Sequence, residues 1–239
     1  MPRNECHTSL PGVSGLNGST NIAASVRQKL LNLAAKSGDD PNLLWNRYAI
    51  ERLLYRLSIS EFKERFVLKG AVLFSVWSGA PHRPTMDLDL EGPVLLDMPP
   101  PIIRIYPMAT VVAEKLHAIV TLGIANSRMK DFYDLYILMR DKEFEYTTLS
   151  VAIKGTFDRR KTPLPFDVPF ALSDAFARDT QKRTQWAAFM RKINGGISLV
   201  ELGVVIIALR QFACPVLGIG EGKQNLKFWP PNGPWQGTI

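Results

Sequence analysis

Two short stretches decide the predicted fold: FVLKGA at residues 66–71 and TMDLDL at residues 85–90. The first is apolar and runs into a lysine–glycine pair, which predicts a buried strand followed by a tight turn. The second alternates apolar and polar residues, which predicts a half-buried strand. Side chains two residues apart on a strand point the same way, so Asp87 and Asp89 share one face.

This pair of aspartates suggests a metal site. Two carboxylates that converge on one spot are unfavourable without a cation, and Mg²⁺ often takes one or two carboxylates together with substrate phosphates. A pair of such ions can hold the attacking and leaving oxygens of a phosphoryl transfer. A solvated acidic strand face gives the same pattern, so both interpretations stay open. The turn at Gly70 and the short helix expected at 71–78 favour the first, because they let backbone amides approach phosphates.

Around these strands the sequence predicts an uneven organisation. We expect a flexible tail at 1–20, an α/β part at 21–107 and a helical part with a C-terminal strap at 108–239. Helices are expected from Asn21 to the stop at Gly38, at 41–57, and then at 110–123, 128–140, 147–160, 180–193 and 198–212. The second helix should bury Leu44, Tyr48, Leu53 and Leu57. The strap, 228–239, should be held by its tryptophans. The fold class is α+β: a truncated mixed sheet followed by a helical bundle.

Composition sets wider limits. The 239 residues are 46% hydrophobic and carry a net charge of +7, which suits a phosphate-rich partner but also fits a merely basic protein. Cys6 and Cys214 match no metal-binding spacing, so we expect free thiols in a reducing cytosol. The apolar run 197–209 is shorter than the roughly 20 residues that a bilayer requires. We therefore expect a soluble cytoplasmic protein with no membrane association.

Four motifs occur in order along the chain: the pair FVLKGA and HRPTMDLDL at 66–71 and 82–90, VAEKL at 112–116, SRMKDFYDLY at 127–136, and WPPNGPW at 229–235. Together they resemble the AbiEii/AbiGii toxin family of nucleotidyltransferases. That family is the toxin half of type IV toxin–antitoxin and phage-abortive-infection systems.

The resemblance implies an activity and a set of roles. Members transfer a nucleoside monophosphate from an NTP, with tRNA as the acceptor in some, and act beside a cognate antitoxin. Asp87 and Asp89 would bind Mg²⁺, Lys115 would contact the triphosphate, and Asp131 or Asp134 would complete the catalytic set. The expected nucleotide-binding residues are Lys69, Gly70, Ser75, Arg83, Lys115 and Lys130.

The residues alone also allow simpler interpretations. Lys115 lies on an apolar helix face and could extend its amine to water. Arg128, Lys130, Asp131 and Asp134 could be ordinary surface charges, and Lys130 and Asp134 are spaced for an i,i+4 surface pair.

The sequence departs from the family after about residue 91, where a segment that usually adds strands and a third acidic residue is missing. Glu91 and Asp97 are candidate substitutes outside the expected motif. The remaining sheet has few strands and little apolar face to bury. Three interpretations follow: an active minimal enzyme, a non-catalytic remnant that binds RNA or an antitoxin, or a deletion product that folds poorly.

Overall fold

The structure is a computed structural model that describes residues 21–70, 73, 77, 96, 98–99, 101–102, 104–193, 200–220 and 225–237. The expected tail at 1–20 and the strand carrying Asp87 and Asp89 lie outside these residues. The chain divides into two compact units, Met1–Trp45 and Asn46–Ile239. Each is described by itself.

The two helices expected before residue 60 are present. α1 spans Ile22–Ser37; the Asn21 side chain caps its first turn, and Gly38 ends it with a left-handed φ of 77°. α2 spans Pro41–Ser58. The predicted apolar face of α2 was wrong at Leu53, which is 59% exposed, whereas its neighbour Leu54 is buried.

The reason lies in tertiary packing. Leu54 joins Leu68, Leu73 and Val111 in a small apolar cluster, and this contact sets which side of α2 faces inward. Helical spacing alone allowed either side.

The predicted strand at 66–68 is reduced to a single bridge. Leu68 pairs in parallel with Ile105. The Leu68 amide donates to the Arg104 carbonyl at 2.8 Å, and the Tyr106 amide donates to the Leu68 carbonyl at 2.9 Å. A 3₁₀ turn, η1 (Lys63–Arg65), precedes it. Within the described residues the sheet has two strands and lies in the helical part, which is consistent with the α+β class; the predicted strand at 85–90 lies outside the described residues.

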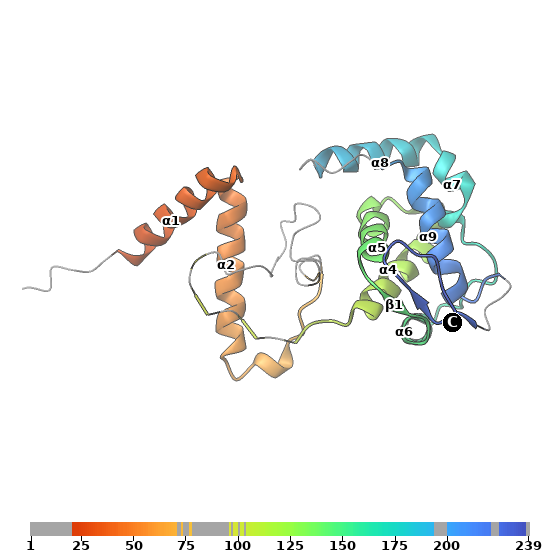
Figure 1. Cartoon of the computed structure of the whole chain (residues 1–239), viewed down its shortest axis with the longest axis horizontal. Helices are drawn as coiled ribbons and strands as arrows, with labels where there is room; N and C mark the ends of the chain where they lie inside the picture. Colours follow the sequence, from red (N-terminus) through yellow and green to blue (C-terminus); the bar gives the residue numbers. More distant parts are fainter. Residues whose placement is uncertain are drawn as a thin grey trace, which may run out of the picture. The chain divides into compact units, whose positions relative to one another are not determined.

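Helices dominate the chain after residue 107 (Figure 1). They are α4 (Met108–Leu122), η2 (Gly123–Ala125), α5 (Met129–Asp141), α6 (Tyr146–Arg159), η3 (Phe170–Leu172), α7 (Asp174–Arg178), α8 (Thr180–Lys192) and α9 (Leu202–Val216). The five predicted helices of this part are confirmed, although the last begins later than expected, at Leu202. The short elements η3 and α7 were not predicted.

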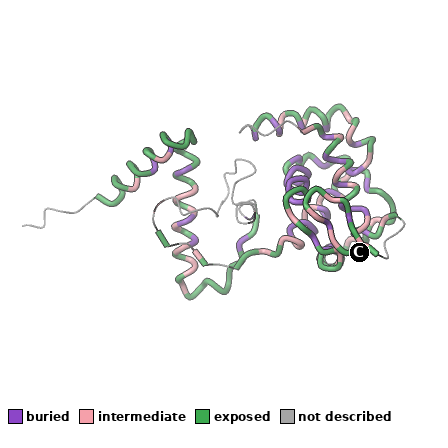
Figure 2. Tube along the Cα trace, in the orientation of Figure 1, coloured by how far each residue is buried: buried purple, intermediate pink, exposed green. Residues whose placement is uncertain are grey.

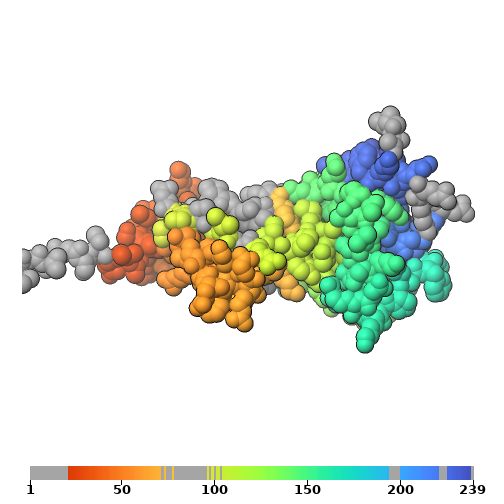
Figure 3. Space-filling model, turned by 90° about the horizontal axis from the view of Figure 1, so that it is seen from below, coloured from red at the N-terminus to blue at the C-terminus, as the bar shows by residue number. Residues whose placement is uncertain are grey.

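The helical part has one large apolar core. Buried positions gather on α4, α5 and α9 (Figure 2), and the segments from α4 onward, yellow-green to blue, pack into a continuous body (Figure 3). α4 and the turn after it, Met108–Ala125, are apolar and long enough to cross a membrane by length and composition. Here Val112, Leu116 and Ile119 of α4 are fully buried in the protein core, which accounts for the apolar composition.

The predicted strap is confirmed. β2 (Phe228–Trp229) pairs antiparallel with β1 (Phe144–Glu145). The Trp229 indole donates to the Met139 carbonyl at 2.7 Å, and the Trp235 indole donates to the Phe212 carbonyl at 2.8 Å. Both rings are buried, so the two tryptophans fasten the C-terminal segment to α5 and α9.

Candidate functional site

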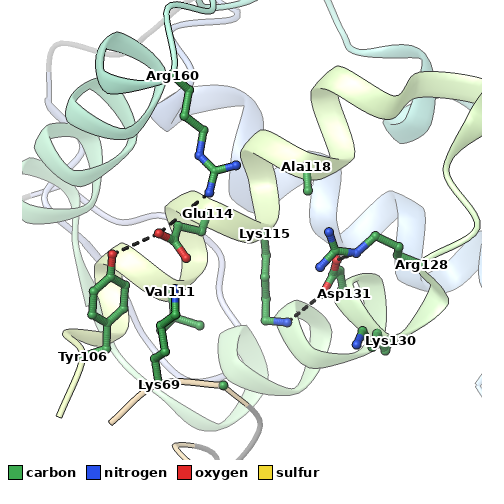
Figure 4. Close-up of a pocket in the computed structure, with 11 residues that line it drawn as sticks. Lys69, Tyr106, Val111, Glu114, Lys115, Ala118, Arg128, Lys130, Asp131 and Arg160 are labelled. Atoms are coloured by element: carbon green, nitrogen blue, oxygen red, sulfur yellow. Dashed lines mark hydrogen bonds and ion pairs between the residues drawn. The ribbon is translucent and has the colours of Figure 1, made fainter. Parts of the chain in front are cut away.

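A cavity of about 260 Å³ opens where α4, the start of α5 and the Lys69–Gly70 turn meet (Figure 4). Its walls carry five cationic side chains and two acidic ones. The cations are Lys69, Lys115, Arg128, Lys130 and Arg160; the acids are Glu114 and Asp131. This excess of positive charge in a concave site favours an anionic ligand.

The inner wall is a buried ion cluster. The Lys115 amine lies 2.8 Å from Asp131 Oδ1 and 2.8 Å from Asp134 Oδ2. Asp131 and Asp134 are three residues apart on α5, so their side chains lie on one helix face. Their side chains are 0% and 1% exposed, and that of Lys115 is 16% exposed.

These contacts decide the charge of Lys115. Burial alone would lower its pKa, but the charges of Asp134 and Asp131 outweigh burial and hold the pKa above the ordinary value of 10.5. The amine is therefore a permanent cation at the edge of the cavity.

Arg128 closes the cluster from the solvent side. Its Nε lies 2.7 Å from Asp131 Oδ2, so Asp131 faces a cation on each oxygen. Asn126 fixes the backbone here: it is fully buried, and its side-chain oxygen accepts from the Arg128 amide at 2.8 Å. The Asn126 carbonyl accepts from the buried Lys182 amine at 3.0 Å. The entry into α5 is thus held by polar contacts on both sides.

The opposite wall is built around Glu114. Glu114 and Lys115 are neighbours on α4 but turn different ways: Lys115 reaches toward Asp131, and Glu114 toward Tyr106 and Arg160 (Figure 4). The Tyr106 hydroxyl donates to Glu114 Oε1 at 2.9 Å, and an Arg160 nitrogen lies 3.8 Å from the same oxygen. Burial and the Glu114 contact raise the pKa of Tyr106, so its hydroxyl keeps its proton.

The floor comes from the turn that the sequence singled out. Gly70 has a φ of 98°, in the left-handed region that glycine adopts without strain. The Lys69 amine lies 5.8 Å from the centre of the Tyr106 ring, a cation–π contact. The bridge between Leu68 and Ile105 therefore brings Lys69 and Gly70 beside the start of α4.

Of the predicted site residues, Lys69, Gly70, Lys115, Lys130 and Asp131 all line this one cavity. Asp134 joins through its ion pair with Lys115. Asp87, Asp89, Ser75 and Arg83 lie outside the described residues. The surface-charge interpretation was wrong for Asp131 and Asp134, which are buried, and Lys115 turns its amine toward them rather than extending it into water.

Three of the four sequence motifs lie within segments that match a known family, and the fourth, at 229–235, lies outside them. A profile described as "Nucleotidyl transferase AbiEii toxin, Type IV TA system" matches residues 52–93 and 91–204. These segments cover more than half of the chain. The chain belongs to the AbiEii family. The two matched segments meet at 91–93, where the sequence predicts the missing segment. No curated protein and no solved structure gives a significant match.

AbiEii membership directs attention to metal binding, because nucleotidyltransferases usually use a divalent ion. The described carboxylates of the cavity do not fit one: Asp131 is held by Lys115 and Arg128, and Glu114 by Tyr106 and arginine. Among the residues that the structure describes, no group of three His, Cys, Asp or Glu side chains could hold a metal ion. The predicted metal ligands, Asp87 and Asp89, lie outside the described residues.

Three residues that line the cavity were not predicted from the sequence: Tyr106, Glu114 and Arg160. Tyr106 follows a proline-rich stretch with no helical or strand period, so nothing marked it. Glu114 lies in the VAEKL motif, but its contact with Tyr106 depends on a loop that is not part of that motif. Arg160 ends α6, and its approach to α4 depends on packing of the two helices.

Proposed function

We propose that this AbiEii chain binds a nucleoside triphosphate in the cavity between α4 and α5 and transfers its nucleoside monophosphate to an acceptor such as tRNA. One observation carries the proposal. Residues from three separate sequence motifs, Lys69–Gly70, Lys115 and Asp131, line one basic cavity. The family supplies the reaction class, and the cavity supplies a place for the triphosphate.

Each residue has a role that follows from its position. Lys69 and Lys130 provide mobile cations for phosphate oxygens, and the Gly70 turn allows close backbone approach. Lys115 adds a fixed charge, because its two carboxylates hold the amine in place. Asp87 and Asp89 would hold Mg²⁺, which would supply further positive charge against the triphosphate.

The proposed reaction is a displacement at phosphorus. The acceptor hydroxyl oxygen forms a bond to the α-phosphorus, the bond from that phosphorus to the pyrophosphate oxygen breaks, and the hydroxyl proton passes to solvent. Lys69, Lys115 and Lys130 would stabilise the charge that gathers on the departing pyrophosphate.

The test uses α-labelled NTPs, one base at a time, with Mg²⁺, total tRNA and the folded full chain. Label on RNA that disappears in Asp89→Asn supports transfer; no label from any of the four NTPs rejects it. Lys130→Glu, at the cavity, should weaken NTP binding roughly tenfold. Lys154→Glu is the matched control, because Lys154 is exposed on α6 away from the cavity.

A second candidate function is a non-catalytic remnant that binds RNA or a cognate antitoxin. The occupied carboxylates favour it, since Asp131 and Asp134 are committed to Lys115. This candidate predicts RNA binding that is unchanged in Asp87→Ala and needs no Mg²⁺. A requirement for Mg²⁺ and Asp89 would contradict it. As the sequence suggests, we place either activity in the cytoplasm.

A further inference from the structure

A second cavity, of about 550 Å³, adjoins the first. It lies between the start of α5 and the end of α8, and Arg128 and Lys130 line both cavities. The wall between the two is therefore the short segment that carries these side chains. A ligand in the second cavity would lie next to one in the first.

The second cavity is cationic. Arg128, Lys130 and Lys192 line it, and no acidic residue is among its lining residues. The charge of Arg128 is partly neutralised by its ion pair with Asp131. Lys130 and Lys192 are exposed, and no carboxylate of the described part of the chain forms an ion pair with either. Both charges are thus available to phosphates.

The floor offers two further contacts. Phe189 is half-buried, and its ring rests edge-on against Tyr133 of α5 at 5.8 Å between ring centres, which holds it rigidly in the cavity wall. An aromatic ring beside cations is the usual platform for a stacked base. The Gln185 side-chain oxygen is buried, with no hydrogen-bond partner among the described residues.

We propose that this second cavity binds the acceptor as a single-stranded nucleic-acid end, with Lys192 and Lys130 on its phosphates and Phe189 against a base. The proposal rests on the proposed function, because an attacking hydroxyl must come within about 3.5 Å of the phosphorus of the bound NTP. Among the described cavities, the second shares Arg128 and Lys130 with the first, which places its ligand beside the proposed nucleotide. An acidic protein segment would pair with the lysines of this cavity but would leave Phe189 without a stacking partner.

The test compares two neighbouring exposed residues on α8. Lys192 lines the cavity and Arg191 does not. A labelled single-stranded oligoribonucleotide should bind Lys192→Glu about tenfold more weakly than the wild type, and the slope of log K against log salt should fall by about 0.7. Arg191→Glu has the same charge change in the same helical turn and should retain most of the affinity. Equal losses in both variants, or no loss in either, overturn the proposal.

Two parallel measurements distinguish failure of the proposed function from failure of the proposed acceptor site. Binding of a non-hydrolysable NTP to the same variants reports the first cavity alone, and it should not change in Lys192→Glu. If the NTP fails to bind the wild type while RNA binding depends on Lys192, the proposed function fails and the second cavity stands as an RNA site. If a polyglutamate peptide displaces the RNA and binds more tightly than it, with the same dependence on Lys192, the occupant is an acidic protein and the proposal is wrong.

Discussion

Replacing Lys115 by methionine should destabilise the protein more than any surface lysine change. Methionine preserves most of the apolar stem but removes the charge that Asp131 and Asp134 share. Both carboxylates are buried, with side-chain exposures of 0% and 1%. Removing one partner from a buried ion pair costs about 3–5 kcal/mol, because an uncompensated charge stays behind.

The structure places the expected cost at the lower end of that range. Asp131 keeps Arg128, whose Nε lies 2.7 Å from its second oxygen, whereas Asp134 loses its 2.8 Å contact with Lys115. We therefore expect a loss of about 3 kcal/mol. At roughly 2–4 °C per kcal/mol for a chain of this size, the melting temperature should fall by roughly 6–12 °C.

Urea unfolding followed by near-ultraviolet circular dichroism measures this loss, since buried tryptophans report the helical part. Adding Asp134→Asn to Lys115→Met should recover part of the stability, because it removes the uncompensated carboxylate. Lys154→Met serves as the surface control. If Lys115→Met unfolds at the wild-type urea concentration, or if Asp134→Asn only adds to the damage, the argument that Lys115 neutralises the buried carboxylates is wrong.

Two further predictions concern the rest of the helical part. Gly233 has a φ of 65°, and a Cβ there would overlap the Trp229 indole, so Gly233→Ala should cost about 2 kcal/mol in thermal unfolding. In contrast, Gly155→Ala on the exposed face of α6 should raise the free energy of unfolding by about 0.5–1 kcal/mol. If the two alanine variants change stability equally, the packing of Gly233 against Trp229 is contradicted. Burial, with help from Arg160, lowers the pKa of His117 below its ordinary value of 6.5. As pH falls, His117 is protonated in the unfolded chain at a higher pH than in the folded protein. The free energy of unfolding should therefore decline as pH falls below about 6.5. His117→Gln should flatten melting temperature against pH, and parallel curves for variant and wild type would exclude this cause.

The helices were predictable because their signals are local. Asn21 and Gly38 mark both ends of α1 by capping chemistry, which depends on a few neighbouring residues. The start of α9 was placed too early because the apolar run begins at Ile197, although Glu201 interrupts that run and is the N-cap of the helix. The choice between Leu53 and Leu54 on α2 was missed because it depends on Leu68, which is distant in sequence.

The sequence named some residues of the cavity but not their partners. Lys115, Asp131 and Asp134 were named because their motifs resemble those of the family, whereas the residues alone also allowed ordinary surface charges. Their pairing with Lys115 required the crossing of α4 and α5, which no local pattern encodes. The same holds for Tyr106 and Glu114, whose hydrogen bond joins a loop to a helix.

These ion pairs determine which residues of the site are available to a triphosphate and which to a metal ion. The charges of Lys115 and Arg128 cancel those of Asp131 and Asp134, so the net positive charge of the cavity comes from its other cations, Lys69, Lys130 and Arg160. A triphosphate needs that charge, but a metal ion needs carboxylates that no protein cation holds. A metal ion would therefore need carboxylates outside the described residues, where the sequence predicts Asp87 and Asp89, whereas the proposed nucleotide binding would not. The basic cavity is present without the segment that the sequence lacks after residue 91, so separate tests of nucleotide binding and of transfer distinguish the enzyme from the binding remnant.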